Sequence, residues 1–113
     1  MSSDQPIEVV NDREAGRLEV KLDGQTAFSE YRVTPKGVIF RHTETPKAFQ
    51  GRGVASAIVR AGLQFARDEK LKVIPICPFF VSYLARHPQY WDQVHPDYLE
   101  TVKAAKDQDA REA

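Results

Sequence analysis

The feature that most constrains the fold of this chain is a single change in the spacing of its apolar residues, close to Gly53. Before that point, polar and apolar residues alternate, as in residues 17–22, and such alternation indicates half-buried β-strands. After it, apolar residues recur every three or four positions, which is the spacing of an amphipathic helix. The chain of 113 residues is long enough for one domain with its own core, so these strands and helices are expected to share it.

Turn signals divide the first part of the chain into four predicted strands. Each is a short stretch of alternating or β-branched residues, bounded by residues typical of turns, such as the hairpin signal Asp23-Gly24. These strands are expected over residues 7–11, 17–22, 25–33 and 38–45. Because short turns place consecutive strands side by side, the sequence predicts an antiparallel meander.

The second part of the chain is predicted to contain helices and one further strand. Pro78 is well suited to the first turn of a helix, because its missing N–H is not needed there. We expect helices from about Gly53 to the charged residues 67–70, over residues 79–86 and over residues 98–109, with a buried strand over residues 71–76. The predicted fold class is α/β, an α+β mixed sheet in which an antiparallel meander is followed by helix, strand and helix.

Charge and cysteine content argue against several classes of protein. Lys and Arg total 16, as do Asp and Glu, whereas broad binding to nucleic acid needs a basic surface. No apolar run approaches the roughly 20 residues that span a bilayer, and residues 1–6 lack the apolar segment of a signal peptide. Cys77 is the single cysteine, and the histidines show no metal-ligand spacing. We therefore expect a cytoplasmic domain that has no nucleic-acid, membrane or metal partner.

The loop before the long predicted helix, Gln50-Gly51-Arg52-Gly53-Val54-Ala55, is a candidate anion-binding site. Glycine lets the backbone approach a ligand with no Cβ in the way. A helix that starts here presents free N–H groups and a positive dipole end, which suit a diphosphate, and Arg52 can add a charged contact. Coenzyme A is the best candidate for the ligand. The alternative is a glycine-rich turn that only begins an ordinary helix.

The loop and its surroundings resemble the GCN5-related N-acetyltransferases. The acyl-CoA signature of that superfamily is Gln or Arg, two residues, Gly, one residue, and then Gly or Ala, which this chain matches at Gln50, Gly53 and Ala55. Three flanking segments are similar to the small YjdJ-type subgroup of acetyl-CoA-binding domains: Arg41-His42-Thr43-Glu44, residues 75–79 and residues 83–90. The resemblance implies a reduced acyl-CoA N-acyltransferase (GNAT-like) fold with acetyl-CoA as the ligand.

The resemblance also implies a division of the chain. It covers roughly residues 7–95, so we expect a flexible N-terminus over residues 1–6, the acetyl-CoA-binding domain over 7–95, and a C-terminal polar helix and tail over 96–113. The chain lacks room for the N-terminal elements that shape the acceptor site in larger members. The acceptor and the oligomeric state stay open.

Four residues are candidate catalytic groups. His42 and Glu44 alternate on a predicted strand and so point the same way. They can act as a general base toward an amine, or they are a polar pair on a solvated face. Thr43 faces the opposite side and is not expected to take part. Cys77 lies just before a helix, where a thiolate is favoured.

Cys77 can take the acyl group from coenzyme A or protonate the leaving thiolate, or it is a buried structural cysteine. Tyr83 is either the general acid or a core aromatic residue with its hydroxyl at the surface. The sequence thus predicts an acetyl-CoA-dependent N-acetyltransferase that acts on an unknown amine, either a small molecule or a protein. The alternative is a non-catalytic module that senses or buffers acetyl-CoA.

Overall fold

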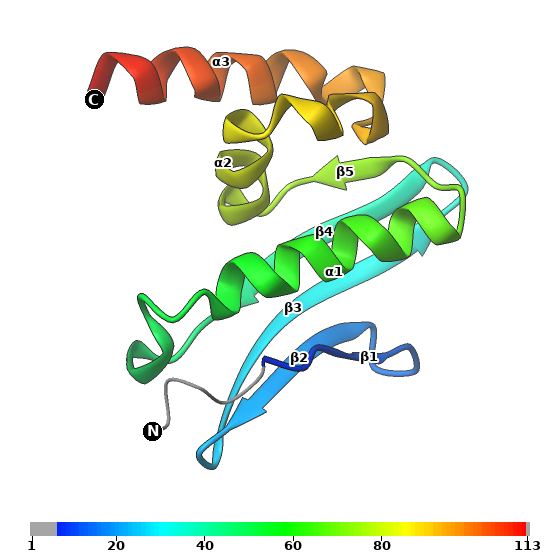
Figure 1. Cartoon of the computed structure of the whole chain (residues 1–113). Coiled ribbons are helices and arrows are strands. Elements are labelled where there is room, and N and C mark those ends of the chain that lie inside the picture. The colour runs from blue at the N-terminus through cyan, green and yellow to red at the C-terminus, as the bar shows by residue number, and fades with distance from the viewer. Residues whose placement is uncertain (1–6, 113) are drawn as a thin grey trace.

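A five-stranded sheet with helices packed on one face forms the core of the computed structural model, which describes residues 7–112 and the side chains of residues 7–106 (Figure 1). The flexible segment predicted for residues 1–6 lies outside the described residues. The strands are β1 (Val10–Asp12), β2 (Arg17–Leu22), β3 (Gln25–Thr34), β4 (Gly37–Glu44) and β5 (Val73–Pro75). The helices are α1 (Val54–Asp68), α2 (Pro78–Arg86) and α3 (Pro96–Glu112), with short 3-10 helices η2 (Lys47–Phe49) and η3 (Pro88–Gln93).

The order of strands across the sheet is β1-β2-β3-β4-β5, the order in which they occur in the chain. The first four strands are antiparallel, and β5 lies parallel to β4 after the α1 crossover. This arrangement confirms the predicted mixed sheet. β1 begins at Val10 rather than at residue 7, because its ladder with β2 covers only the pairs from Val10–Glu19 to Asp12–Arg17.

β5 is shorter than predicted, with three residues in place of six. Pro75 ends it, because proline has no N–H to donate to a continued ladder. The chain then turns into α2, and the N–H groups of Ile76 and Cys77 both donate to the carbonyl oxygen of Phe40, at 3.1 and 2.9 Å. Pairing between β4 and β5 therefore stops at Phe40.

A β-bulge in β4 decides which of its side chains face the helices. Tyr31 pairs with Phe40 and Glu30 with His42, so Arg41 has no partner in β3. The extra residue shifts the alternation by one position. Phe40 is completely buried, whereas both Arg41 and His42 are exposed, and the next half-buried side chain is that of Thr43.

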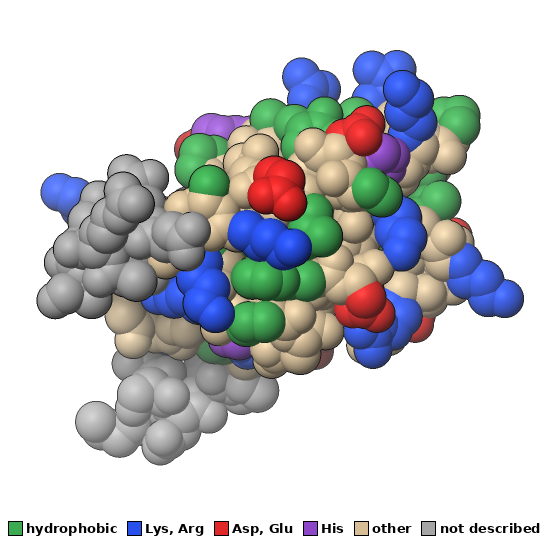
Figure 2. All heavy atoms as spheres, turned by 90° about the horizontal axis from the view of Figure 1, so that it is seen from above, with side chains coloured by type: hydrophobic (Ala, Val, Ile, Leu, Met, Phe, Trp, Pro, Cys, Tyr) green, Lys and Arg blue, Asp and Glu red, His purple; other side chains and the backbone are tan. Residues whose placement is uncertain are grey.

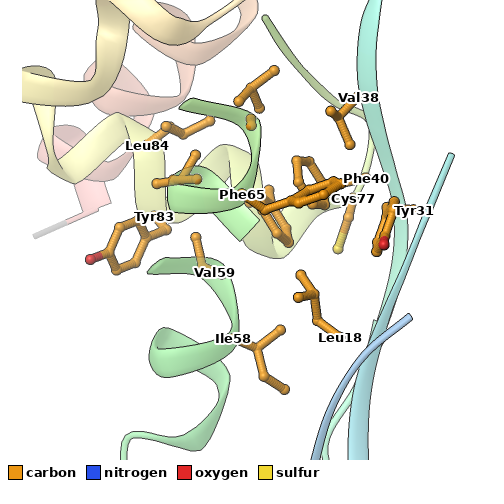
Figure 3. Packing of buried hydrophobic residues seen from close by; sticks show 14 of the residues in the cluster. Leu18, Tyr31, Val38, Phe40, Ile58, Val59, Phe65, Cys77, Tyr83 and Leu84 are labelled. Carbon is orange, nitrogen blue, oxygen red and sulfur yellow. The ribbon is translucent and has the colours of Figure 1, made fainter. Parts of the chain in front are cut away.

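The core lies between the sheet and helices α1 and α2 (Figure 3). Phe40 stacks on Phe80 of α2, with ring centroids 4.2 Å apart, and α1 approaches the same ring closely at Gly62. A Cβ at Gly62 would come within 2.8 Å of Phe40, so the helix packs here only because glycine has no side chain. Val59 of α1 is also buried, because α1 contacts α2 as well as the sheet.

The C-terminal part of the chain packs on α2. η3, which the sequence did not predict, is fixed by a hydrogen bond from the Trp91 indole to the carbonyl of Leu84 and by one from Gln93 to that of Leu63. α3 then runs along α2 and buries Val102 completely. Seen from the α3 side, Lys and Arg side chains stand among acidic and apolar ones (Figure 2). Within residues 7–112, no helix combines the length and apolar character that crossing a membrane requires.

Candidate functional site

A pocket of about 540 Å³ lies where β4 ends and α1 begins. Its walls are Thr43 and Thr45 from the end of β4, Phe49 and the loop that follows it, the first turn of α1, and Phe79 of α2. The predicted anion-binding loop thus borders a real cavity, of a size typical for ligand pockets. Phe79 is 42% exposed and gives the pocket an apolar wall. The sequence offered only one weak signal for it, an aromatic residue directly after Pro78.

The backbone conformation of the loop explains why glycine stands at two of its positions. Gly51 and Gly53 have φ values of 79° and 77°, a left-handed conformation that side chains with a Cβ rarely adopt. A Cβ built on either glycine would have no atom within 4 Å. The space beside the loop is therefore open to a ligand, and the conformation alone requires glycine in the ligand-free chain.

The first turn of α1 offers donors to that space. Gly53 caps the helix without any side-chain hydrogen bond, and the first intrahelical bond runs from the N–H of Ala57 to the carbonyl of Gly53. The N–H groups of Val54, Ala55 and Ser56 precede that bond, as the unpaired donors of a helix start do. All three residues line the pocket. Together with the helix dipole they suit a negatively charged group.

Arg52 lies apart from these donors. One guanidinium nitrogen is 3.5 Å from the Asp23 carboxylate, at the turn between β2 and β3, and the group is 5.6 Å from the centre of the Phe49 ring. Arg52 is not part of the pocket wall. Its side chain links the loop to the β2–β3 turn, and the charge of the pocket comes from backbone donors instead.

Because β4 and β5 separate after Phe40, backbone groups of β4 lie unpaired beside the pocket. β5 pairs only with Val38–Phe40, so residues 41–44 of β4 have β3 on one side and, within residues 7–112, no strand on the other. Thr43 lies in this unpaired part and lines the pocket. Free backbone groups along a strand edge can pair with an extended, amide-containing ligand.

Cys77 lies just behind the pocket wall and is 3% exposed. Its thiol donates a hydrogen bond to the Thr43 hydroxyl, with the sulfur and oxygen 3.3 Å apart. The Thr43 hydroxyl donates in turn to that of Ser29, at 3.1 Å, and Ser29 is completely buried. Thr43 was not expected to take part in the site, yet it is the residue that joins the pocket to Cys77. The bulge at Arg41 explains why, because it turns Thr43 toward the helices.

His42 and Glu44 form the predicted pair on the other face of β4. The imidazole Nε2 is 2.8 Å from a carboxylate oxygen of Glu44, and the side chains are 53% and 61% exposed. The ring of Phe28 lies edge-on to the imidazole, with centroids 6.2 Å apart. The pair is accessible to solvent, but β4 stands between it and the pocket.

Tyr83 does not join the other candidate residues. It is 8% exposed, and its ring stacks on that of His87 with centroids 4.0 Å apart. The hydroxyl points away from Cys77 and from the sheet (Figure 3). Tyr83 is not part of the pocket wall. Within the described side chains, no three His, Cys, Asp or Glu residues come together as metal ligands would.

Comparison with known proteins relates the sequence of this chain to one family. The profile of a family described as GCN5-related N-acetyl-transferase matches residues 17–94. Protein NATD1 of Mus musculus is 33% identical over 96 residues, which are 80% of this chain and 87% of the mouse protein. Protein NATD1 of Xenopus tropicalis is 33% identical over 102 residues, which are 85% of this chain and 93% of the frog protein. The match with the family covers the whole pocket, from β4 to α2.

Proposed function

This chain belongs to the GCN5-related N-acetyltransferase family, and on that premise we propose that it binds acetyl-CoA and transfers the acetyl group to an amine. The observation that carries the proposal is the pocket at the start of α1, which combines free backbone donors with an unpaired strand edge. A diphosphate and an amide-containing arm are the two parts of coenzyme A that such surfaces suit.

The proposed placement of the cofactor follows from these donors. The N–H groups of Val54, Ala55 and Ser56 hold the diphosphate at the helix start, next to Gly51 and Gly53. The unpaired edge of β4 aligns the pantetheine arm, with Phe79 against its apolar side. This directs the thioester toward Thr43, which lines the pocket.

The proposed chemistry places proton acceptor and proton donor on opposite faces of β4. We place the amine at the unpaired edge of β4, between the pocket on one face and His42 on the other, so that His42, paired with Glu44, takes its proton. The amine nitrogen attacks the thioester carbonyl, and the bond between carbonyl carbon and sulfur breaks. Cys77 supplies the proton for the departing thiolate in preference to Tyr83, because the Cys77 thiol is hydrogen-bonded to a hydroxyl of the pocket wall, whereas the Tyr83 hydroxyl points away from Cys77 and from the sheet (Figure 3).

The test is acetyl transfer from acetyl-CoA to a panel of small amines and lysine peptides. We expect His42→Ala to lower kcat by about 100-fold or more, the usual contribution of a general base. His95→Ala is the matched control. The His95 ring also lies beside a carboxylate, that of Asp97, at 3.8 Å, but His95 is not part of the pocket wall. The control is expected to keep wild-type kcat.

Two outcomes separate the proposal from its alternative. If acetyl-CoA stabilises the wild-type protein against heat but no amine is acetylated, transfer is contradicted and a binding module that senses or buffers acetyl-CoA is supported. Two observations favour that alternative: β4 separates the His42–Glu44 pair from the pocket, and Cys77 is buried. If acetyl-CoA neither stabilises the protein nor binds, both functions are contradicted.

A further inference from the structure

We propose that the Thr43 hydroxyl is the proton relay between the buried Cys77 thiol and the sulfur of the leaving coenzyme A. The inference rests on the proposed function, since it concerns the proton that the departing thiolate needs. Its basis is a chain of three side chains from three elements, Cys77, Thr43 and Ser29, of which only Thr43 reaches the pocket.

Burial makes a relay necessary. Cys77 is 3% exposed and is not part of the pocket wall, so its proton reaches the pocket only through a neighbouring group. The Cys77 thiol already donates to the Thr43 oxygen, at 3.3 Å. The Thr43 hydroxyl is therefore in place to accept that proton while it gives its own to an atom in the pocket.

Ser29 sets the direction of the Thr43 hydroxyl at rest. The Thr43 proton points to the Ser29 oxygen, at 3.1 Å, and Ser29 is completely buried between β2 and β4. A hydroxyl both donates and accepts, and it rotates to suit its partners. When Thr43 turns its proton toward the pocket, Ser29 can donate to the Thr43 oxygen, and the chain stays bonded throughout.

The proton transfer balances. As the thioester bond breaks, the Thr43 O–H bond breaks and an S–H bond forms on coenzyme A, while the proton of the Cys77 S–H bond moves to the Thr43 oxygen. Cys77 is left as a thiolate, which accepts a hydrogen bond from the Thr43 hydroxyl. It regains a proton from water in the pocket through the Thr43 hydroxyl, and His42 releases to water the proton it took from the amine. The net reaction is that of an amine and acetyl-CoA giving an amide and free coenzyme A.

The experiment compares Thr43→Val with Thr43→Ser and with Thr26→Val. Valine keeps the shape of threonine without its hydroxyl, and serine restores the hydroxyl. Thr26 is a half-buried threonine of the same sheet, on β3, and is not part of the pocket wall. We expect Thr43→Val to lower kcat by about 10- to 100-fold, the value of a hydrogen bond to a charged group. For Thr43→Val, KM for acetyl-CoA and Kd for coenzyme A are expected within twofold of wild type. For Thr43→Ser and for the control variant, kcat is expected within about threefold of wild type.

A second arm tests whether Thr43 acts through Cys77. In a Cys77→Ala background, Thr43→Val is expected to cause no further loss of kcat, because residues that act in one chain are not additive. Independent losses that multiply would overturn the relay. So would a Thr43→Val variant with wild-type kcat in an enzyme that turns over.

Two further measurements keep the test decisive. Thr43→Val leaves the buried Ser29 hydroxyl without its partner, which can weaken the fold. The double variant Ser29→Ala/Thr43→Val removes both hydroxyls and so avoids that effect. If the loss of activity comes from the lost relay, the double variant is expected to match Thr43→Val in kcat. If the wild-type protein binds coenzyme A but shows no turnover, the proposed transfer fails and the relay with it. If turnover is present and unaffected by Thr43→Val, the relay alone fails.

Discussion

At the scale of the residue, Gly53 and Gly24 have the same backbone conformation in different surroundings. Both have a φ of 77°, and a Cβ on either would have no atom within 4 Å. Gly53 borders the pocket, whereas Gly24 lies in the turn between β2 and β3. Substitution of both glycines therefore distinguishes two effects: the loss of stability from a strained backbone, which is expected at both positions, and the loss of ligand binding, which is expected only at Gly53.

We expect Gly53→Val and Gly24→Val to lower the free energy of unfolding by similar amounts, about 1–2 kcal/mol each, because both force a β-branched residue into a left-handed conformation. Only Gly53→Val is expected to weaken binding of coenzyme A, by at least about tenfold, or roughly 1.4 kcal/mol. Chemical denaturation and calorimetric titration measure the two quantities. Equal affinity of both variants for coenzyme A would contradict the placement of the diphosphate at this loop.

The side chains of β4 show which part of the site the local sequence pattern predicts. The two-residue spacing of His42 and Glu44 correctly predicted that they share a face and lie close together. It did not predict which face, because a β-bulge at Arg41 adds one residue to the strand. Thr43 consequently lines the pocket and contacts Cys77. The residues around Arg41 carry no local signal for the bulge, which is defined by the pairing of β4 with β3.

At the scale of the element, a side-chain hydrogen bond joins β1 to β3. The Tyr31 hydroxyl, on β3, donates to the side-chain oxygen of Asn11, on β1. Burial raises the pKa of the Tyr31 hydroxyl above its ordinary value of 10.0, although the charge of Arg13 opposes that shift. The folded protein therefore holds the Tyr31 proton more tightly than the unfolded chain does.

This difference predicts an alkaline loss of stability. Below pH 10 both states keep the proton and the stabilisation is complete. As the pH rises above 10, the unfolded chain loses the proton first, so stability falls until the folded-state pKa is passed. We expect Tyr31→Phe to be less stable than wild type at pH 7 by about 1 kcal/mol, from the lost hydrogen bond.

Above pH 10, Tyr31→Phe is expected to lose stability less steeply than wild type. Urea unfolding at a series of pH values from 7 to 11 measures both effects. Tyr98→Phe is the control, since Tyr98 is only partly buried and packs in α3 rather than in the sheet. Parallel pH curves for wild type and Tyr31→Phe would contradict the assigned role of burial.

At the scale of the whole molecule, α3 packs on α2 through a small apolar contact. Val102 is completely buried, although most other described residues of α3 are polar and exposed or half-buried. α2 in turn contributes Phe80 and Leu84 to the core. The boundary predicted between residues 95 and 96 stays a prediction, and the packing of Val102 gives a way to test it.

We expect Val102→Ala to lower the free energy of unfolding of the whole domain by about 1–3 kcal/mol, through lost burial and a new cavity. Glu100→Ala, at an exposed position of the same helix, is expected to change it by less than about 0.5 kcal/mol. Denaturation is followed by far-ultraviolet circular dichroism and by the fluorescence of Trp91, near α3. Coincident transitions are expected. A separate, earlier transition in circular dichroism would support an independent C-terminal segment.

The sequence by itself determined the order of elements, the mixed sheet and the glycine loop at the start of α1. These depend on local information: the spacing of apolar residues, turn residues such as Asp23-Gly24, and a signature within six residues. Only the tertiary structure decided which groups meet at the site. Two long-range contacts do this: Cys77 with Thr43, and Thr43 with Ser29. Each joins residues far apart in the chain, and each depends on strand register and on the β-bulge, which no local pattern encodes.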